Sequence, residues 1–271
     1  MNLRIVSDNA ADRAAVAAST TAGGYVAANL LVDLKSNWHR ATGTSVTYTV
    51  TWSAAETISC VAIPYCNLSP TATMRVRLYA ADGVSVVYDS TAVSACPAPA
   101  LRPRGWTAAQ AASAYANGGG ACARHWFAPR SAFKLVLDLV DVNNLQGYIE
   151  AARLVVGAYW SPAYNDFGAS VTNVDSTTHY RTGAGDLVSD AGTVHRRVPV
   201  ELSRMAAADR AKMAAILRDS RAYPIFLSLL PGVADFDLER DYTVYGKRTR
   251  DSDVTMQFAL AYSTSIEIEE I

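Results

Sequence analysis

Short runs of alternating apolar and polar residues, separated by turn residues, fill residues 1–157. The clearest run is Thr73–Tyr79, where Met74, Val76 and Leu78 share one face; a period of two is typical of a half-buried strand. The turn signal Asp82-Gly83 follows and predicts a hairpin with residues 84–88. Further strand-like runs are residues 46–52, 58–63, 133–140 and 148–156, and we expect the last two to pair.

Residues 158–271 have a different pattern, which includes one segment with helical spacing. We expect a helix over residues 203–218, with Ser203 as its N-cap. Its apolar face is predicted to consist of Leu202, Met205, Met213, Ile216 and Leu217. Strands are expected at residues 198–202, 223–230 and 242–247, and one long strand at 254–268. The sequence therefore predicts a mainly β protein: a β-sandwich in residues 1–157, then a smaller α+β domain with one main helix in residues 158–271.

Residues 93–128 interrupt the strand pattern with prolines and a Gly-rich stretch. A loop of this length inside a compact domain is uncommon and usually has a function. It carries Trp106, Tyr115 and Trp126, and aromatic side chains are enriched at protein interfaces. The terminal strand adds Phe258, Ile266 and Ile268, the two isoleucines alternating with acidic residues. We expect these six residues to form an oligomer interface, and the chain to assemble into a homo-oligomeric ring.

Composition and charge narrow the possible partners. Of the 271 residues 50% are hydrophobic and 18% are charged, which allows a sizeable core. A net charge of −1 gives no electrostatic footprint for nucleic acid. The N-terminus has no apolar segment of signal-peptide type, and no run approaches the roughly 18 apolar residues of a membrane span. We therefore expect synthesis in the cytoplasm, with neither nucleic acid nor a membrane span.

The sequence offers no set of residues for catalysis. It contains no G-x-S-x-G, H-E-x-x-H or phosphate-loop motif, so we expect no catalytic residues, no cofactor and no enzyme activity; glycan hydrolysis is the outside alternative. The four cysteines lack zinc spacing, and we expect free thiols, although Cys96 and Cys122 bracket the irregular stretch and can approach each other. No metal site is predicted, while a calcium site that includes Asp33 or Asp138 stays open.

The N-terminal half resembles a known family. The segment Asn29-Leu-Leu-Val-Asp33 with the nearby Trp38, and a closing segment at residues 147–157, resemble the discoidin or galactose-binding-like jelly roll. The resemblance implies a jelly-roll β-sandwich that binds carbohydrate through loops at one end. The residues it implies are Trp38, His39, Arg40, Trp106 and Trp126. Two alternatives stay open: Trp38 plugs the core, or Trp106 and Trp126 pack against a neighbouring subunit.

The C-terminal half resembles the connector domains of tailed-bacteriophage tail-tip and baseplate proteins, especially the distal tail class. The resemblance rests on the order strand, helix, Tyr223-Pro-Ile-Phe-Leu227, Val244-Tyr-Gly246 and a long final strand. It implies a structural component of a phage tail tip or baseplate, with other tail proteins as partners. Its place would be the virion, after assembly in the bacterial host cytoplasm. The alternative is a carbohydrate-binding module that recognises a host-surface glycan.

Overall fold

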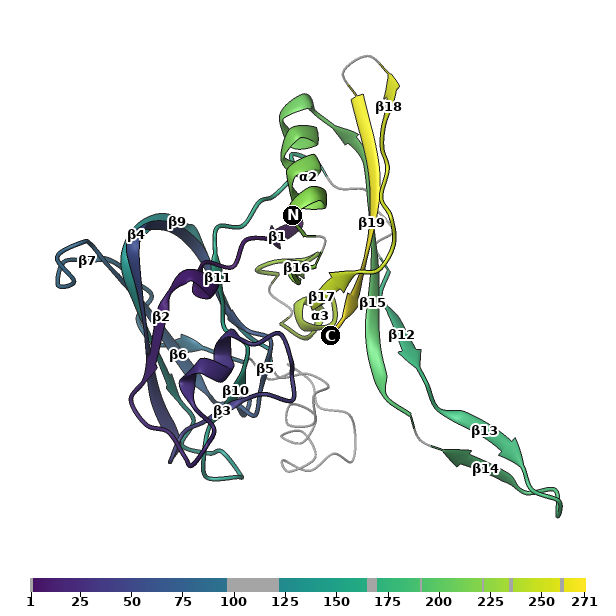
Figure 1. Ribbon diagram of the computed structural model, residues 1–271, viewed down its shortest axis with the longest axis horizontal. Coiled ribbons are helices and arrows are strands. Elements are labelled where there is room, and N and C mark those ends of the chain that lie inside the picture. Colours follow the sequence, from purple (N-terminus) through teal and green to yellow (C-terminus); the bar gives the residue numbers. More distant parts are fainter. Residues whose placement is uncertain are drawn as a thin grey trace.

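The computed structural model describes residues 2–96, 122–164, 170–190, 192–220, 222–233, 236–258 and 261–271. A β-sandwich stands beside a second, curved sheet that carries a helix on one face (Figure 1). The protein is mainly β, which confirms the predicted fold class. None of the described helices has the length and apolar character that crossing a membrane requires.

Two long antiparallel strands, β4 (Ser45–Ile63) and β9 (Ala123–Val140), form the centre of the sandwich. The register shifts between Thr51 and Glu56, and again between Ile58 and Cys60. Such bulges bend a strand and increase its twist. The two runs predicted at 46–52 and 58–63 are therefore two halves of one bent strand. The rest of this sheet consists of β2 (Ala15–Ala18), β6 (Thr73–Tyr79), β7 (Val86–Asp89), β8 (Val93–Ser94) and β11 (Val155–Gly157).

The predicted hairpin at Asp82-Gly83 is confirmed, because β6 and β7 pair across it. Gly83 has a φ of 68°, and the Asp82 carboxylate accepts the backbone N–H of Ser85 at 2.8 Å. The other predicted pair is wrong: residues 133–140 lie in β9, which pairs with β4 and β6. Residues 148–156 divide between β10 (Glu150–Ala152) and β11, which belong to different sheets. Between them Arg153 has a φ of 63°, a left-handed conformation that ends the strand.

A second, three-stranded sheet closes the sandwich, in the order β3 (His39–Arg40), β10 and β5 (Tyr65–Cys66). The core between the sheets contains the fully buried Tyr48 and Leu135. Trp52 is 4% exposed and its indole N–H donates to the carbonyl of Ala10 at 2.7 Å. The tryptophan that fills the core is thus Trp52, whereas Trp38 is only half-buried.

The second module is built on a twisted sheet with the order β1-β16-β17-β19-β15-β12, to which β18 adds. Its first strand, β1 (Arg4–Val6), comes from the start of the chain and pairs with β16, Ile5 opposite Leu227. Residues 4–6 therefore lie in the second sheet, although the predicted boundary at residue 157 assigns them to the first domain. The other strands are β12 (Thr172–Asp175), β15 (Val194–Met205), β16 (Ile225–Ser228), β17 (Thr243–Arg248), β18 (Val254–Phe258) and β19 (Ala261–Glu270).

The main helix, α2 (Ala207–Asp219), begins later than predicted. Ser203 lies in β15, and the N-cap is Ala206, which makes no side-chain cap hydrogen bond. The predicted apolar face is confirmed for Met213, Ile216 and Leu217, which α2 buries in the second core. Leu202 and Met205 are buried in the same core but belong to β15, so they are not part of the helix. A short helix, α3 (Phe236–Asp241), occupies residues for which the sequence predicted no helix.

The predicted long strand at 254–268 is two strands. β18 and β19 pair antiparallel, with Met256 opposite Tyr262, so the chain reverses between them. Ile266 and Ile268 are 3% and 0% exposed and lie in the second core. This corrects their assignment to an oligomer interface: their own chain covers them. The side chain of Phe258 is outside the described residues.

A thin hairpin extends from the second sheet. It consists of β13 (Thr178–Arg181) and β14 (Leu187–Asp190), which pair only with each other. We call this hairpin the arm. In Figure 1 it points away from the rest of the molecule, beyond the ends of β12 and β15.

The sandwich and the second sheet meet at a buried arginine. Arg153 is 2% exposed; its Nε donates to the Tyr245 hydroxyl at 2.7 Å and lies 2.9 Å from an Asp33 carboxylate oxygen. Its Nη2 donates to Asp12 at 2.8 Å, and Tyr245 donates to Asp33 at 2.8 Å. Around this network an apolar cluster joins Val6, Cys60, Val155, Phe226 and Tyr245. The carboxylate of Asp33, left open as a calcium ligand, is thus bound by protein groups.

We expect Arg153→Met to lower the free energy of unfolding by about 2 kcal/mol, because it takes the buried guanidinium away from Asp12 and Asp33. The two carboxylates are 40% and 29% exposed, so water screens part of the loss. Arg77→Met is the matched control. Arg77 pairs with Asp138 across the sandwich surface, where both side chains are about one-quarter exposed (26% and 25%), so it should cost at most about 1 kcal/mol. Urea unfolding with two probes, tryptophan fluorescence and circular dichroism, measures both. Equal small losses would contradict a central role for Arg153.

Candidate functional site

The three-stranded sheet builds a polar end on the sandwich. Side chains alternate along β3, so His39 points into the core and Arg40 points outward. β10 places Glu150 opposite Arg40. The Arg40 Nε donates to the Glu150 carboxylate at 2.7 Å, which fixes the guanidinium over the sheet edge.

Aromatic rings surround this ion pair. The Arg40 guanidinium lies 4.4 Å from the ring centre of Tyr25 and 4.5 Å from that of Tyr148. Tyr25 in turn stacks on Trp38, with centroids 5.9 Å apart and an interplanar angle of 10°. The Asn29 amide donates to the Trp38 carbonyl at 2.8 Å and holds this loop in place. A cation between aromatic faces is attracted to both of them, so the cluster is preorganised.

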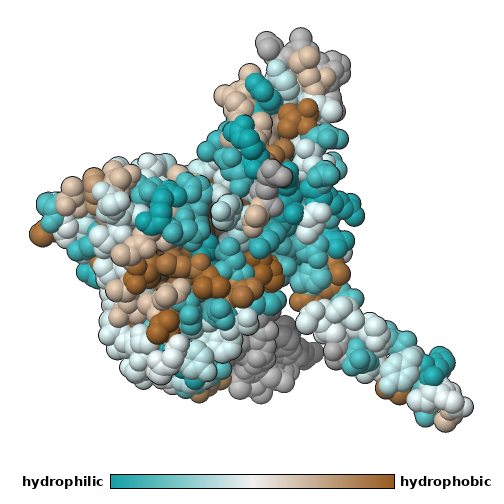
Figure 2. All heavy atoms as spheres, viewed as in Figure 1, coloured by the Kyte–Doolittle hydropathy of each residue, from teal (hydrophilic) through white to brown (hydrophobic). Residues whose placement is uncertain are grey.

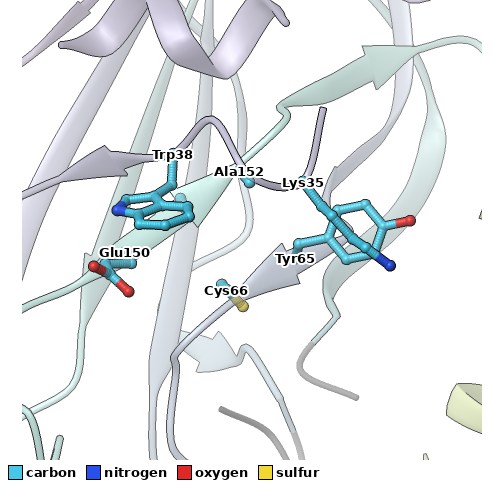
Figure 3. Close-up of a pocket in the computed structure, with 7 residues that line it drawn as sticks. Lys35, Trp38, Tyr65, Cys66, Glu150 and Ala152 are labelled. Atoms are coloured by element: carbon cyan, nitrogen blue, oxygen red, sulfur yellow. The ribbon is translucent and has the colours of Figure 1, made fainter. Parts of the chain in front are cut away.

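A pocket of about 260 Å³ opens beside Trp38. Figure 3 shows the side chains of Lys35, Trp38, Tyr65 and Glu150 around it, with Cys66 on its lower wall. The pocket combines an aromatic face, a cation and a carboxylate within a small volume. Sites of this kind suit a polar ring-shaped ligand, which stacks on the aromatic face and is oriented by the polar groups.

His39 has a structural role instead. It is 0% exposed; its Nε2 lies 3.0 Å from the Thr20 carbonyl and its Nδ1 lies 2.9 Å from the Tyr48 hydroxyl. A carbonyl only accepts, so Nε2 carries the hydrogen and Nδ1 accepts from Tyr48. Burial lowers the pKa of His39, partly offset by the Thr20 hydrogen bond. Because no part of the ring reaches the surface, His39 is removed from the predicted sugar-contacting residues.

Trp126 lies at the junction between the two modules. Its indole N–H donates to Glu239 at 3.0 Å, and its ring stacks on Phe226 at 5.7 Å. The Arg4 guanidinium covers the ring at 5.4 Å. Trp126 therefore contacts residues of the second module and is not among the residues that line the pocket beside Trp38. Trp106 and Tyr115 lie outside the described residues.

The structure thus brings Trp38 and Arg40 together and adds residues that the sequence reasoning missed: Lys35, Tyr25, Tyr65, Tyr148 and Glu150. Glu150 is more than a hundred residues from Arg40 in sequence. No local pattern specifies that these two strands are neighbours. The adjacency of Gly147 to Tyr148 was the one available signal, since a turn glycine (φ 74°) precedes an aromatic residue at the end of the sandwich.

No family model and no curated protein matches the sequence. Solved structures with a similar fold cover about half of the chain. The domain CpGH89CBM32-5 of Clostridium perfringens, in complex with GalNAc-β-1,3-galactose, is 11% identical over 56% of this chain and 100% of its own, with a TM-score of 0.40. A chitosan-binding module from Paenibacillus sp. IK-5 is 12% identical over 56% and 98%, with a TM-score of 0.39.

A fucose-binding module of Streptococcus pneumoniae is 12% identical over 55% of this chain and 94% of its own, with a TM-score of 0.38. These neighbours are carbohydrate-binding modules, and each is matched over nearly its whole length. Identities and TM-scores of this size do not carry a ligand from one protein to another. What this chain binds must therefore be argued from its own residues.

Because His39 is buried, we expect the folded protein to lose stability as the pH falls. Its pKa is lower in the folded chain than its ordinary value of 6.5, so unfolding takes up a proton once the pH falls below about 6.5. The stability contributed by neutral His39 is complete above that pH and is lost as the pH falls, with a slope of at most about 1.4 kcal/mol per pH unit. Burial lowers the pKa of His125 in the same direction.

Urea unfolding between pH 7.5 and 5 measures this slope. We expect His39→Asn to be less stable at every pH and to show a shallower pH dependence than the unchanged protein. His179→Asn is the control, because His179 is exposed on the arm and should leave the slope unchanged. An unaltered slope in the His39 variant would show that the ring is not protonated on unfolding.

Proposed function

We propose that the chain is a structural protein that assembles through its arm, rather than an enzyme. The arm is the observation that carries this proposal, because it has no core of its own. Seven of its eight strand residues are exposed and Val188 is half-buried. Isolated two-stranded hairpins are marginally stable in water, so a persistent arm implies contacts beyond this chain.

The side chains of the arm fit a protein partner. Tyr180 is 56% exposed and Leu187 is 61% exposed, and Val194 at the base of the arm is 57% exposed. Figure 2 shows the arm as a mostly polar projection with isolated apolar side chains. Tyrosine is among the residues that are enriched at protein interfaces, and Tyr180 is the aromatic residue of the arm.

The strand at the base of the arm supports the same conclusion. β12 is the last strand of the second sheet and pairs on one side with β15. Edge strands present N–H and C=O groups to which another chain can add a strand. The arm and β12 together therefore supply a continuous extended surface for association.

The finer proposal is a phage tail tip or baseplate protein that forms a ring with its own copies and contacts other tail proteins in the virion. Its support is the order β15, α2, β16 and β17, which the resemblance predicts for residues 198–247; the short helix α3 between β16 and β17 is an addition to that order. The terminal hairpin β18–β19 departs from the single long strand of that pattern. The place of assembly, the bacterial cytoplasm, follows from the same proposal.

Replacing residues 177–192 by an Asn-Gly turn tests the arm. The pair of Ser176 and Thr193, joined by a 3.1 Å backbone hydrogen bond, remains to hold the new turn. We expect an unchanged unfolding temperature, since the arm contributes nothing to either core, and at least tenfold weaker self-association. Sedimentation velocity over a range of protein concentrations measures the association.

Point variants separate the arm from general surface effects. Tyr180→Ser combined with Leu187→Ser should weaken association, whereas Val84→Ser should not, although Val84 is 77% exposed on the sandwich hairpin. A wild-type chain that is monomeric at every concentration, and that enters particles normally without its arm, would contradict the proposal.

A second candidate function is carbohydrate binding by the sandwich. The specific observation is the pocket beside Trp38, where the buried indole N–H has no hydrogen-bond partner among the described residues. Lys35 and Glu150 line the same pocket. An aromatic wall with two charges matches the stacking and hydroxyl recognition that sugars require.

A glycan array followed by titration calorimetry tests this candidate. We expect Trp38→Ala to weaken binding of any sugar found by at least tenfold, which corresponds to about 1.4 kcal/mol. Tyr164→Ala is the matched control, because Tyr164 is 72% exposed in the second module. An array without any bound glycan, or equal affinities in the two variants, would reject a sugar site at Trp38.

A further inference from the structure

Two of the four cysteines lie against each other in the sandwich. Cys66 ends β5 and pairs with Ala151 of β10. Cys96 follows β8 and is 1% exposed in the first core, against which Cys66 packs. The two thiols are hydrogen-bonded to one another. The sequence predicted free thiols and left open an approach of Cys96 to Cys122; all four thiols are free, and Cys66 is the one hydrogen-bonded to Cys96.

The backbone keeps the two thiols in place. On one side β5 is fixed to the three-stranded sheet by the pairs Ala151–Cys66 and Ala152–Tyr65. On the other side the N–H of Ala95 donates to the Ala72 carbonyl at 2.9 Å, immediately before Cys96. Both residues are therefore anchored by structure that does not involve the thiols.

The environment makes the two thiols chemically different. Burial alone would raise the pKa of Cys66, but hydrogen bonds from the Cys96 thiol and from the backbone of Leu68 and Ala123 outweigh it and lower the pKa. The hydrogen bond to Cys66, together with burial, raises the pKa of Cys96 well above its usual value. The thiolate is the reactive form of cysteine, so Cys66 is the nucleophile of the pair.

Cys66 also has access to solvent. It is half-buried and lines the pocket beside Trp38, with Lys35 on the opposite wall (Figure 3). Cys60 is 0% exposed, and burial raises the pKa of both Cys60 and Cys122. Activation and access therefore coincide at one cysteine, and a second thiol is in contact with it.

We propose that Cys66 and Cys96 form a redox-active dithiol that closes to a disulfide in the folded protein. The oxidant is a small disulfide such as oxidised glutathione. The Cys66 thiolate attacks one of its sulfurs and releases the first glutathione, which leaves a mixed disulfide on Cys66. The Cys96 sulfur, after losing its proton, attacks Cys66 and releases the second glutathione. Two protein thiols are oxidised, one small disulfide is reduced, and two protons end on the released thiols.

The crosslink would change the edge of the sandwich. It closes the segment from Cys66 to Cys96, which contains β6, β7 and β8. A disulfide that closes such a segment restricts the unfolded chain and so stabilises the folded one. A reducing compartment keeps the thiols open, and an oxidising one closes them. The inference is independent of both proposed functions.

The experiment places the folded, full-length protein in glutathione buffers of increasing oxidised fraction. Acid quenching, alkylation under denaturing conditions and intact mass then count the free thiols. We expect the count to fall from four, the number of cysteines, to two, with peptide mapping that joins Cys66 to Cys96. A higher unfolding temperature should accompany the loss.

Variants separate the proposed chemistry from simple proximity. The Cys96→Ser variant should accumulate one glutathione on Cys66, because no second thiol resolves the mixed disulfide. The Cys66→Ser variant should form no disulfide, so its remaining thiols should all be alkylated. Cys60→Ala is the control and should still form the link. Four free thiols at every buffer, a link between Cys96 and Cys122, or glutathione on Cys60 instead of Cys66 would overturn the proposal. If a serine variant does not fold, the peptide map of the unchanged protein still shows whether Cys66 is joined to Cys96.

Discussion

The fold depends on a single arginine held in a conformation that arginine rarely adopts. A positive φ at a residue other than glycine costs free energy, and Arg153 keeps it because its guanidinium bonds Asp12, Asp33 and Tyr245. The backbone kink ends β10 and starts β11, so the strand changes sheet at that point. The side chain at the same position joins the sandwich to the second module. One residue thus takes part both in the change of sheet and in the junction between the modules.

The junction explains why the molecule can present two separate surfaces. Because β1 pairs with β16, the chain starts in the second sheet, crosses into the sandwich and returns through β11. The chain thus crosses between the modules twice. The Arg153 network and the ion pair of Arg124 with Glu239, at 3.0 Å, link the modules further. The pocket beside Trp38 belongs to the sandwich and the arm belongs to the second sheet. The two surfaces therefore belong to different modules joined by these contacts.

The sequence predicted what depends on local patterns, and missed what depends on pairing between distant segments. The hairpin at Asp82-Gly83 and the apolar face around Ile216 follow from turn chemistry and helical spacing, and both are confirmed. The contacts of Arg40 with Glu150, and of Cys66 with Cys96, require a strand register that no single segment encodes. The long strand at 254–268 failed for a related reason, since an alternating run looks the same whether it continues straight or folds back on itself.

The arm gains less free energy from burial than the two cores do, and this difference would affect how the proposed assembly proceeds. Residues of the two cores gain burial within one chain, whereas the arm has its hydrogen bonds exposed to water and no apolar face covered. Its ordering is therefore marginal until a partner excludes water from it. Binding that orders a segment loses part of its interaction free energy to that ordering, so a single arm should bind weakly. In the proposed ring this weakness would be offset, because each copy would both give and receive an arm and the contacts would reinforce one another. Under that proposal, weak association of free chains and firm association in a complete ring would have the same physical cause.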